Sequence, residues 1–338
     1  MNIISQLNMT LPIIFINPYF NQDCRLIDKV TELGGVGVID HVTAGPALFA
    51  SDTSISRGIR AHLNDLTHAE EASGIKLAIV PMEDCDLFES LEEGALSKFS
   101  FPVLVEVGSI EHVRQAERLR AQGLIVKGTE GGGWVSATHG FVLLQQVLET
   151  SRLPVFHQGG VGPCTAAGVI RAGGAGIVLD YHLLLTDESA IDPELKKFFT
   201  NLNLPSSTLL NEVSGSVFRA YSRIGTKKIR ELKKFEESMA TENFDKYRGI
   251  LSKTIGHPTA TPDIDDSIFP FSEDLVINKG LFKESCSVSD VIKKFVDAMK
   301  IGPSQWPFEE GSALSVEHGV KFPVVQGPMA HEATTRTF

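Results

Sequence analysis

The sequence predicts an α/β protein: a TIM-type (β/α)8 barrel, closed or irregular, followed by a helical segment. Short apolar runs alternate with segments of helical periodicity, which is typical of parallel strands that are buried on both faces. Glycine-rich turns follow two of the last runs, at the end where a barrel carries its ligand sites. With 338 residues, the chain is long enough for one large barrel and a smaller additional segment.

Seven apolar runs in roughly the first half of the chain predict the strands. They cover residues 11–18, 34–40, 76–81, 101–107, 124–126, 154–156 and 177–179. Helices are expected between them at 21–33, 59–73, 87–98 and 110–121. A closed barrel needs eight strands, so a further strand is expected near residues 45–51 unless the barrel is irregular.

The second half of the chain gives little sign of buried strands. Residues 187–237 are predicted to be mostly helical, with two helices in 209–237 that break at Gly225. The helical pattern continues at 242–251. Residues 289–301 form a clear amphipathic pattern, so we expect this last helix to pack one apolar face against the barrel.

Composition excludes several classes of protein. The hydrophobic fraction is 42% and the mean hydropathy is +0.04, and no apolar run is long enough to span a bilayer. The net charge of −11 argues against a nucleic-acid partner, and the basic run 227–234 is interpreted as a solvated helix face. Four scattered cysteines favour neither disulfides nor a zinc site. No signal peptide is evident at the N-terminus, so a cytoplasmic location is expected.

The turn after the run 154–156 carries the clearest signal for an anion site. Gly159 and Gly160 are followed by Pro163, which suits the first turn of a helix. The free N–H groups at such a helix start can hold a phosphate. In (β/α)8 barrels this site lies after the last two strands, and here the second of those strands ends at Asp180 and Tyr181.

Three titratable side chains near strand ends are candidates for catalysis: Lys127, His157 and His182. Lys127 and His157 directly follow apolar runs, and His182 follows the last run. Each has a structural alternative, because Lys127 can cap a loop and His157 can be a hydrogen-bonded histidine of the rim. The histidines show no metal-ligand spacing, so no metal is expected.

Gly131, Gly132 and Gly133 form a turn after the run 124–126. The turn is either a flexible connection or a cradle for a cofactor. It is not a phosphate-binding Walker loop, because no Lys-Ser or Lys-Thr pair follows it. The preceding Glu130 is interpreted as an anchor of the loop.

These segments also carry a family resemblance. K-G-x-E-G-G-G from Lys127, P-V-x-x-x-G-G-V from Pro154 and G-A-G-I-V-L-D-Y from Gly174 resemble the second half of a nitronate monooxygenase-type barrel, a family that includes flavin-dependent enoyl reductases of fatty-acid synthesis. The resemblance implies FMN, with its phosphate on the Gly159-Gly160 loop and the loop after the last strand. It allows NADPH as an electron donor.

Three departures from the family pattern fall at one site. Trp134 stands where the family has the histidine that acts as base in nitronate oxidation, and an indole cannot accept a proton. Asp180 and Tyr181 replace Gly-Thr, which places a carboxylate beside the implied phosphate. The first strand has Ile-Asn-Pro at 16–18 instead of Gln-Gly-Pro. One of the three catalytic candidates would therefore have to replace the base.

The end of the chain resembles the start of another barrel of this kind. P-V-V-Q-G-P-M at 323–329 follows His318 and Gly319, an order similar to that of polyketide and polyunsaturated fatty-acid synthases such as heterocyst glycolipid synthases. The resemblance implies the N-terminal portion of such a synthase, whose other domains would be partners. The predicted parts are a barrel over 1–190, a helical extension over 191–315 and the start of a truncated second barrel over 316–338.

Two functions are consistent with the sequence. The first is an FMN-dependent oxidoreductase module that acts on an acyl or nitroalkane-like substrate. The second is a non-catalytic barrel that scaffolds the synthase, because fold alone does not fix function.

Overall fold

The computed structural model describes residues 3–21, 23–42, 57–71, 74–212, 216–222, 226–238, 244–256, 268–282, 286–300 and 309–324. The chain divides into two units, Met1–Met299 and Lys300–Phe338, and each is described by itself. The larger unit contains the barrel and the candidate functional site.

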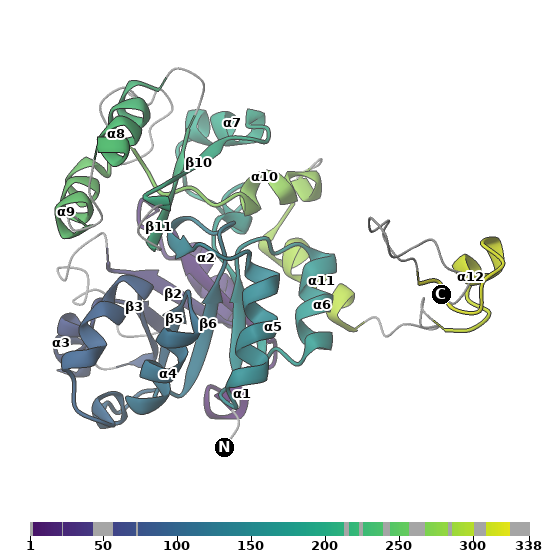
Figure 1. The fold of residues 1–338 in the computed structure, drawn as a ribbon, viewed down its shortest axis with the longest axis horizontal. Helices are drawn as coiled ribbons and strands as arrows, with labels where there is room; N and C mark the ends of the chain where they lie inside the picture. Colours follow the sequence, from purple (N-terminus) through teal and green to yellow (C-terminus); the bar gives the residue numbers. More distant parts are fainter. Residues whose placement is uncertain are drawn as a thin grey trace, which may run out of the picture. The chain divides into compact units, whose positions relative to one another are not determined.

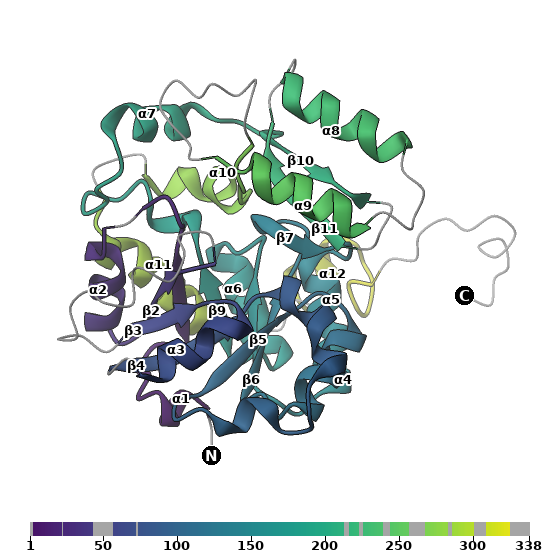
Figure 2. The same ribbon diagram turned by 90° about the vertical axis from the view of Figure 1, so that its left-hand side faces the viewer.

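Eight parallel strands form a closed barrel, as the sequence predicted (Figures 1 and 2). In barrel order they are β1 (Ile13–Asn17), β2 (Val36–Asp40), β3 (Arg57–Arg60), β4 (Ile75–Val80), β5 (Val103–Val107), β6 (Gly123–Lys127), β8 (Val155–Gln158) and β9 (Gly176–Leu179). β9 closes the barrel on β1, with Ile13 opposite Ile177. The seven predicted strands are confirmed.

The eighth strand is β3, and it lies where the sequence analysis expected the start of a helix. The helix expected from residue 59 begins only after this strand, with a 3-10 turn η2 (Leu63–Asp65) and α3 (Leu66–Glu71). The strand expected near 45–51 falls outside the described residues. β3 escaped the search for apolar runs because its barrel-facing positions are Gly58 and the buried Arg60.

The barrel interior is filled by one face of the other seven strands. These side chains are Ile14, Ile16, Val36, Val38, Leu77, Ile79, Leu104, Ile125, Phe156 and Val178. They recur at every second residue, as expected for strands. The next interior position on several strands, toward their carboxyl ends, is polar, so the apolar filling stops where the mouth of the barrel begins.

Helices and 3-10 turns connect the strands and cover the outside of the barrel. They are α1 (Ile3–Gln6), α2 (Arg25–Glu32), η3 (Met82–Ser90), η4 (Ala95–Lys98), α4 (Ile110–Arg118), α5 (Gly140–Thr150), α6 (Pro163–Ala172) and η5 (Tyr181–Leu183). The helix at 110–121 is confirmed. The predicted helix at 87–98 is wrong, because the described chain forms two separate 3-10 turns there.

A three-stranded antiparallel sheet, which we call the lid sheet, was not predicted. It consists of β7 (Gly133–Ser136), β11 (Ser216–Tyr221) and β10 (Ser207–Leu210). The prediction of helix over 209–221 is therefore wrong. β11 pairs with a strand about 80 residues earlier in the chain, and a pairing so distant leaves no local pattern in the sequence.

Helices complete the larger unit. They are α7 (Pro193–Asn201), α8 (Lys227–Ser238), α9 (Phe244–Thr254), α10 (Asp274–Asn278), the 3-10 turn η8 (Lys279–Phe282) and α11 (Val288–Lys300). α11 buries Val291, Ile292 and Phe295 in the main core, which confirms the packing predicted for this helix. In both views the lid sheet, α8 and α9 lie over one end of the barrel (Figures 1 and 2).

The smaller unit contains one short described helix, α12 (Ala313–Glu317). Most of the segment that resembles a second barrel, residues 325–338, falls outside the described residues, so that resemblance stays a prediction. No helix in the described part of the chain combines the length and apolar character that crossing a bilayer requires.

Candidate functional site at the barrel mouth

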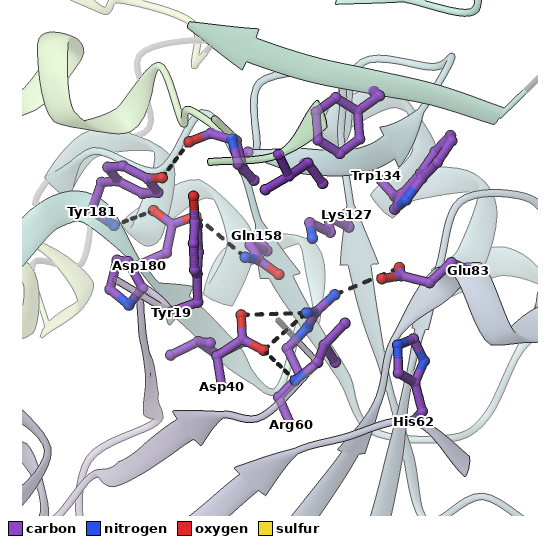
Figure 3. Close-up of a pocket in the computed structure, with 18 of the residues that line it drawn as sticks. Tyr19, Asp40, Arg60, His62, Glu83, Lys127, Trp134, Gln158, Asp180 and Tyr181 are labelled. Atoms are coloured by element: carbon purple, nitrogen blue, oxygen red, sulfur yellow. Dashed lines mark hydrogen bonds and ion pairs between the residues drawn. The ribbon is translucent and has the colours of Figure 1, made fainter. Parts of the chain in front are cut away.

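The mouth of the barrel is floored by polar side chains. Six strands, or the residue directly after them, supply one interior polar residue each: Asp40, Arg60, Glu106, Lys127, Gln158 and Asp180. Five of these line a pocket of about 380 Å³, and Glu106 lies beneath it. Figure 3 shows Arg60, Lys127 and Gln158 at the centre of the floor, between Asp180 and Tyr181 on one side and Glu83, His62 and Trp134 on the other.

The floor cluster, defined as Asp40, Arg60, Glu106 and Lys127, is a buried network of ion pairs. Arg60 holds Glu106 through two hydrogen bonds, Nε–Oε1 at 2.6 Å and Nη2–Oε2 at 2.9 Å. Asp40 Oδ1 lies 3.2 Å from Arg60 Nη1, and Lys127 Nζ lies 3.4 Å from Glu106 Oε2. Burial opposes the charge on Glu106, but Arg60 and Lys127 outweigh burial and lower its pKa to about 2.

The roof of the pocket is apolar and comes from the lid sheet and the segments around it. Trp134 on β7 and Phe218 on β11 pack edge to face, with ring centroids 5.3 Å apart. Ile255 and Pro270 extend this wall. The pocket therefore opposes an apolar aromatic wall to a charged floor.

His62 lines the pocket and was missed by the sequence analysis. Its Nδ1 lies 2.8 Å from Asp84 Oδ1, and Asp84 also accepts the N–H of Leu63. The hydrogen bond to Asp84 raises the pKa of His62. Beside it, burial raises the pKa of Glu83, whose carboxylate lies 3.6 Å from Arg60. Once β3 is recognised, the strand-end rule that selected Lys127 also selects His62.

On the other side of the mouth, the backbone of Val161 has its own partners. Its N–H donates to Asp274 Oδ1 at 2.7 Å. Its carbonyl accepts a bond of 2.8 Å from Asn278 Nδ2 and lies 2.8 Å from His182 Nε2. Both residues from α10 thus reach across to the loop between β8 and α6.

Asp180 forms similar hydrogen bonds in the neighbouring loop, which follows β9. Its Oδ1 accepts the N–H of Tyr181 at 2.5 Å, and its Oδ2 accepts from Gln158 Nε2 at 3.3 Å. Its own N–H donates to His182 Nδ1 at 3.1 Å. We call Asp180, His182 and Asp274, with the Val161 backbone, the closed corner.

The side chains of the closed corner are buried, and Asp180 also borders the mouth pocket. Burial raises the pKa of Asp274 to about 7. For Asp180, burial is outweighed by the hydrogen bond with His182, and the pKa is lowered. The three side chains place ligand atoms within 4.8 Å of one another, as a metal site would. Both nitrogens of His182, however, already contact backbone groups, so the geometry is that of an internal hydrogen-bond network.

His157 lies outside the mouth. It precedes Gln158 on β8 and so points to the opposite face of the strand, where its ring contacts Phe141 at 6.4 Å. It lines a second pocket of about 400 Å³ together with Gly159 and Gly160. Burial lowers the pKa of His157 to about 4, so the ring is neutral at pH 7.

The glycine turns bring backbones close together. A Cβ on Gly159 would lie 2.7 Å from the backbone nitrogen of Gly131, and its φ is +93°. A Cβ on Gly132 would lie 3.0 Å from the nitrogen of Ser272. Gly132 and Gly133 also line the mouth pocket, as do Asp180 and Tyr181. Close packing between backbone segments of this one chain thus explains much of the glycine pattern.

Comparisons with known proteins point to one family. The profile named nitronate monooxygenase matches residues 86–266. An enzyme of Rhodococcus jostii (strain RHA1), named (3aS,4S,5R,7aS)-5-hydroxy-7a-methyl-1-oxo-octahydro-1H-indene-4-carboxyl-CoA dehydrogenase, is 25% identical over 211 residues. The match covers 58% of this chain and 58% of that enzyme, so this chain spans little more than half the length of its relative.

Solved structures share the fold. FabK from Thermotoga maritima superposes with a TM-score of 0.66 at 18% identity, over 88% of this chain and 95% of that one. The enoyl reductase domain of MlnA, from the macrolactin biosynthesis cluster of Bacillus amyloliquefaciens, gives 0.63 at 10% identity, over 88% and 96%. Because the family profile spans more than half of the chain and includes the strands that carry Glu106 and Lys127, the chain belongs to the nitronate monooxygenase family.

Proposed function

We propose that the barrel mouth binds the acyl group of a thioester, and that the chain is a module of oxidoreductase fold within a lipid or polyketide synthase. The names of similar proteins support the substrate class. The Rhodococcus relative is named as the dehydrogenase of a carboxyl-CoA, and the MlnA structure is an enoyl reductase domain from a biosynthesis cluster.

The observation that carries the proposal is Lys127 beneath an apolar wall. The side chain is 5% exposed and its Nζ lies 3.4 Å from Glu106. An ammonium has three donors, so further N–H groups can be turned toward a carbonyl oxygen in the pocket. The acyl chain would then contact Trp134 and Phe218, whose burial on binding is favourable.

Proton transfer at the α-carbon of the bound acyl group is chemistry that this chain's own residues can supply. The α-C–H bond breaks, its electron pair forms an enolate, and His62 Nε2 takes the proton while Asp84 stabilises the imidazolium. Lys127 donates to the enolate oxygen, where negative charge develops. Return of the proton from His62 completes an exchange that needs no oxidant.

The second candidate is FMN-dependent oxidation or reduction of an acyl substrate, with NADPH as donor. Membership of the family favours a flavin, and the open side of the mouth offers an aromatic wall for a planar ring. The fit fails at the phosphate, because the N–H groups of Val161 and Tyr181 are already donated to Asp274 and Asp180. Nitronate oxidation has less support still, since Trp134 offers no base.

Fluorescence of Trp134 tests the acyl site. Trp306 is the second tryptophan of the chain, so a Trp306→Phe background isolates the signal. The probe is an enoyl thioester of N-acetylcysteamine, which carries no phosphate. We expect saturable quenching and, in Lys127→Met, about tenfold weaker binding, which corresponds to about 1.4 kcal/mol.

Lys197→Met on α7 is the matched control, since this lysine is exposed and should leave affinity unchanged. Absence of saturable binding by the folded protein, or equal affinity in Lys127→Met, would contradict the proposal. Consumption of NADPH with the thioester and added FMN would favour the second candidate.

A further inference from the structure

We propose that Asp274 and Asp180 take the place of a phosphate in this barrel, so that it does not accept the phosphate group of FMN, or another phosphate, at the position where (β/α)8 barrels bind one. The inference concerns the closed corner and does not depend on acyl binding at the open side of the mouth.

The location of the closed corner is the first argument. Phosphates in (β/α)8 barrels lie at the loops after the seventh and eighth strands, beside a helix N-terminus whose free N–H groups point at the anion. In barrel order those strands are β8 and β9. Val161 lies in the loop between β8 and α6, and Tyr181 starts the 3-10 turn after β9.

The second argument is that the backbone N–H groups of Val161 and Tyr181 already have acceptors. The N–H of Val161 donates to Asp274 Oδ1 at 2.7 Å, and that of Tyr181 donates to Asp180 Oδ1 at 2.5 Å. An N–H group has one hydrogen to donate, so a phosphate oxygen would have to displace a carboxylate oxygen from each. Asp180, whose pKa is lowered, already provides a charge-assisted acceptor for Tyr181, and the Asp274 carboxyl already provides an acceptor for Val161.

Rigid attachment of Asp274 is the third argument. Ser272 Oγ donates to its Oδ2 at 3.2 Å, and the side chain is 0% exposed. Its helix is tied to the glycine turn by the N–H of Glu273, which donates to the carbonyl of Glu130 at 3.1 Å. Asn278 of the same helix binds the Val161 carbonyl. Displacing Asp274 would break several of these contacts together.

Charge is the fourth argument. The acidic groups that line the mouth are Asp40, Glu83 and Asp180, and the permanently cationic ones are Arg60 and Lys127. Both cations are paired with Glu106. In the corner itself burial favours the neutral form of Asp274, whereas at Asp180 burial is outweighed by the hydrogen bond with His182, which lowers the pKa. A phosphate dianion would therefore meet the charged Asp180 carboxylate, and like charges repel.

Two probes test the inference: inorganic phosphate, and the pair FMN and riboflavin, which differ by the phosphate alone. The variants are Asp274→Ala, Asp180→Gly and their combination. Asp274→Asn is the matched control, because its amide oxygen can still accept from Val161 and should keep the corner closed. Circular dichroism and the unfolding midpoint establish that each variant is folded.

For the wild type we expect no thermal stabilisation by phosphate beyond that of chloride at equal ionic strength, and FMN no tighter than riboflavin. A ligand that binds the native state raises the midpoint, so the folded double variant should be stabilised by phosphate and should bind FMN at least about tenfold more tightly than riboflavin. If the double variant is unfolded, the same measurements are made on the folded single variants. For these we expect a smaller gain in affinity for phosphate and FMN.

Tenfold preference of the wild type for FMN over riboflavin would overturn the inference. So would folded variants that gain no affinity for phosphate or FMN, or an Asp274→Asn protein that opens the corner as fully as Asp274→Ala. Because the thioester probe carries no phosphate, loss of acyl binding and failure of this inference are distinguishable.

Discussion

The floor cluster and the closed corner lie at the same end of the barrel and are built from the same kinds of residues, yet they face different surroundings. Lys127 and Arg60 have their partners on other strands of the barrel and line an open pocket. Asp274 and Asp180 instead accept the backbone N–H groups of Val161 and Tyr181, and His182 contacts the Val161 carbonyl. Asp180 borders the same pocket, so the two clusters differ in whether their polar side chains bind one another or bind the backbone.

The two clusters also shift the pKa of a buried carboxylate in opposite directions. Two cations outweigh burial at Glu106 and hold its pKa low. At Asp274 burial prevails over the attraction of His182, and the pKa is raised. The first carboxylate is stabilised in its charged form and the second in its neutral form, which gives the clusters opposite dependence on pH.

The largest effect is expected from Glu106→Ala. The change leaves Arg60 and Lys127 buried without their shared partner, which costs about 3–5 kcal/mol of unfolding free energy. Urea denaturation at pH 7 measures it. Asp28→Ala is the control, because its ion pair with Arg57 is partly exposed and should cost about 1 kcal/mol or less. Equal losses in both variants would show that the floor cluster is not a buried network.

The opposite pH dependence is the second prediction. Glu106 has a pKa of about 2 against the usual 4.5, so its contribution is complete above pH 4.5 and is lost as pH falls toward 2. Asp274 has a pKa of about 7 against 3.8, so its contribution is lost as pH rises from about 4 to 7. Each pKa unit corresponds to about 1.4 kcal/mol.

Unfolding free energies of Glu106→Gln, Asp274→Asn and wild type, measured from pH 3 to 8, test this. Relative to wild type, Asp274→Asn should gain stability as pH rises, and Glu106→Gln should lose it. Parallel pH profiles of the three proteins would contradict the assignment.

The third prediction concerns the hydrogen bond to Val161. Asp274→Ala leaves this buried N–H unpaired, which costs about 1–3 kcal/mol. Asp274→Asn retains an acceptor and should cost less than about 1 kcal/mol at pH 5, where the native carboxyl is protonated. Denaturation of both variants at that pH measures the difference in unfolding free energy. If Asp274→Ala is as stable as the wild type, the Val161 N–H does not need Asp274 as its acceptor.

The smallest effect on stability is expected at His62, whose side chain is 39% exposed. His62→Gln should cost less than about 1 kcal/mol but slow proton exchange at the α-carbon of a bound thioester by about 10²–10⁴-fold. Deuterium uptake followed by NMR measures it. Asp84 raises the pKa of His62. The rate of proton exchange in the wild type should therefore increase as pH rises through this raised pKa. Unchanged exchange in His62→Gln would exclude it as the base.

The sequence was sufficient where structure follows local pattern. Apolar runs identified seven strands, but β3 was missed because its interior position holds Arg60, whose partner Glu106 lies 46 residues away. Strand periodicity alone could have assigned His157 and Gln158 to opposite faces. The closed corner could not be predicted, since Asp274 lies 113 residues beyond Val161 and carries no motif of its own.

The most direct test of the contrast between the two clusters is the amide resonances of Val161 and Tyr181 in the wild-type protein, recorded while inorganic phosphate is added. If Asp274 and Asp180 occupy these two N–H groups, neither resonance moves, while the Trp134 indole resonance still responds to the thioester at the open side of the mouth. Saturable movement of the Val161 and Tyr181 resonances with phosphate would show that the corner is open and would contradict the account.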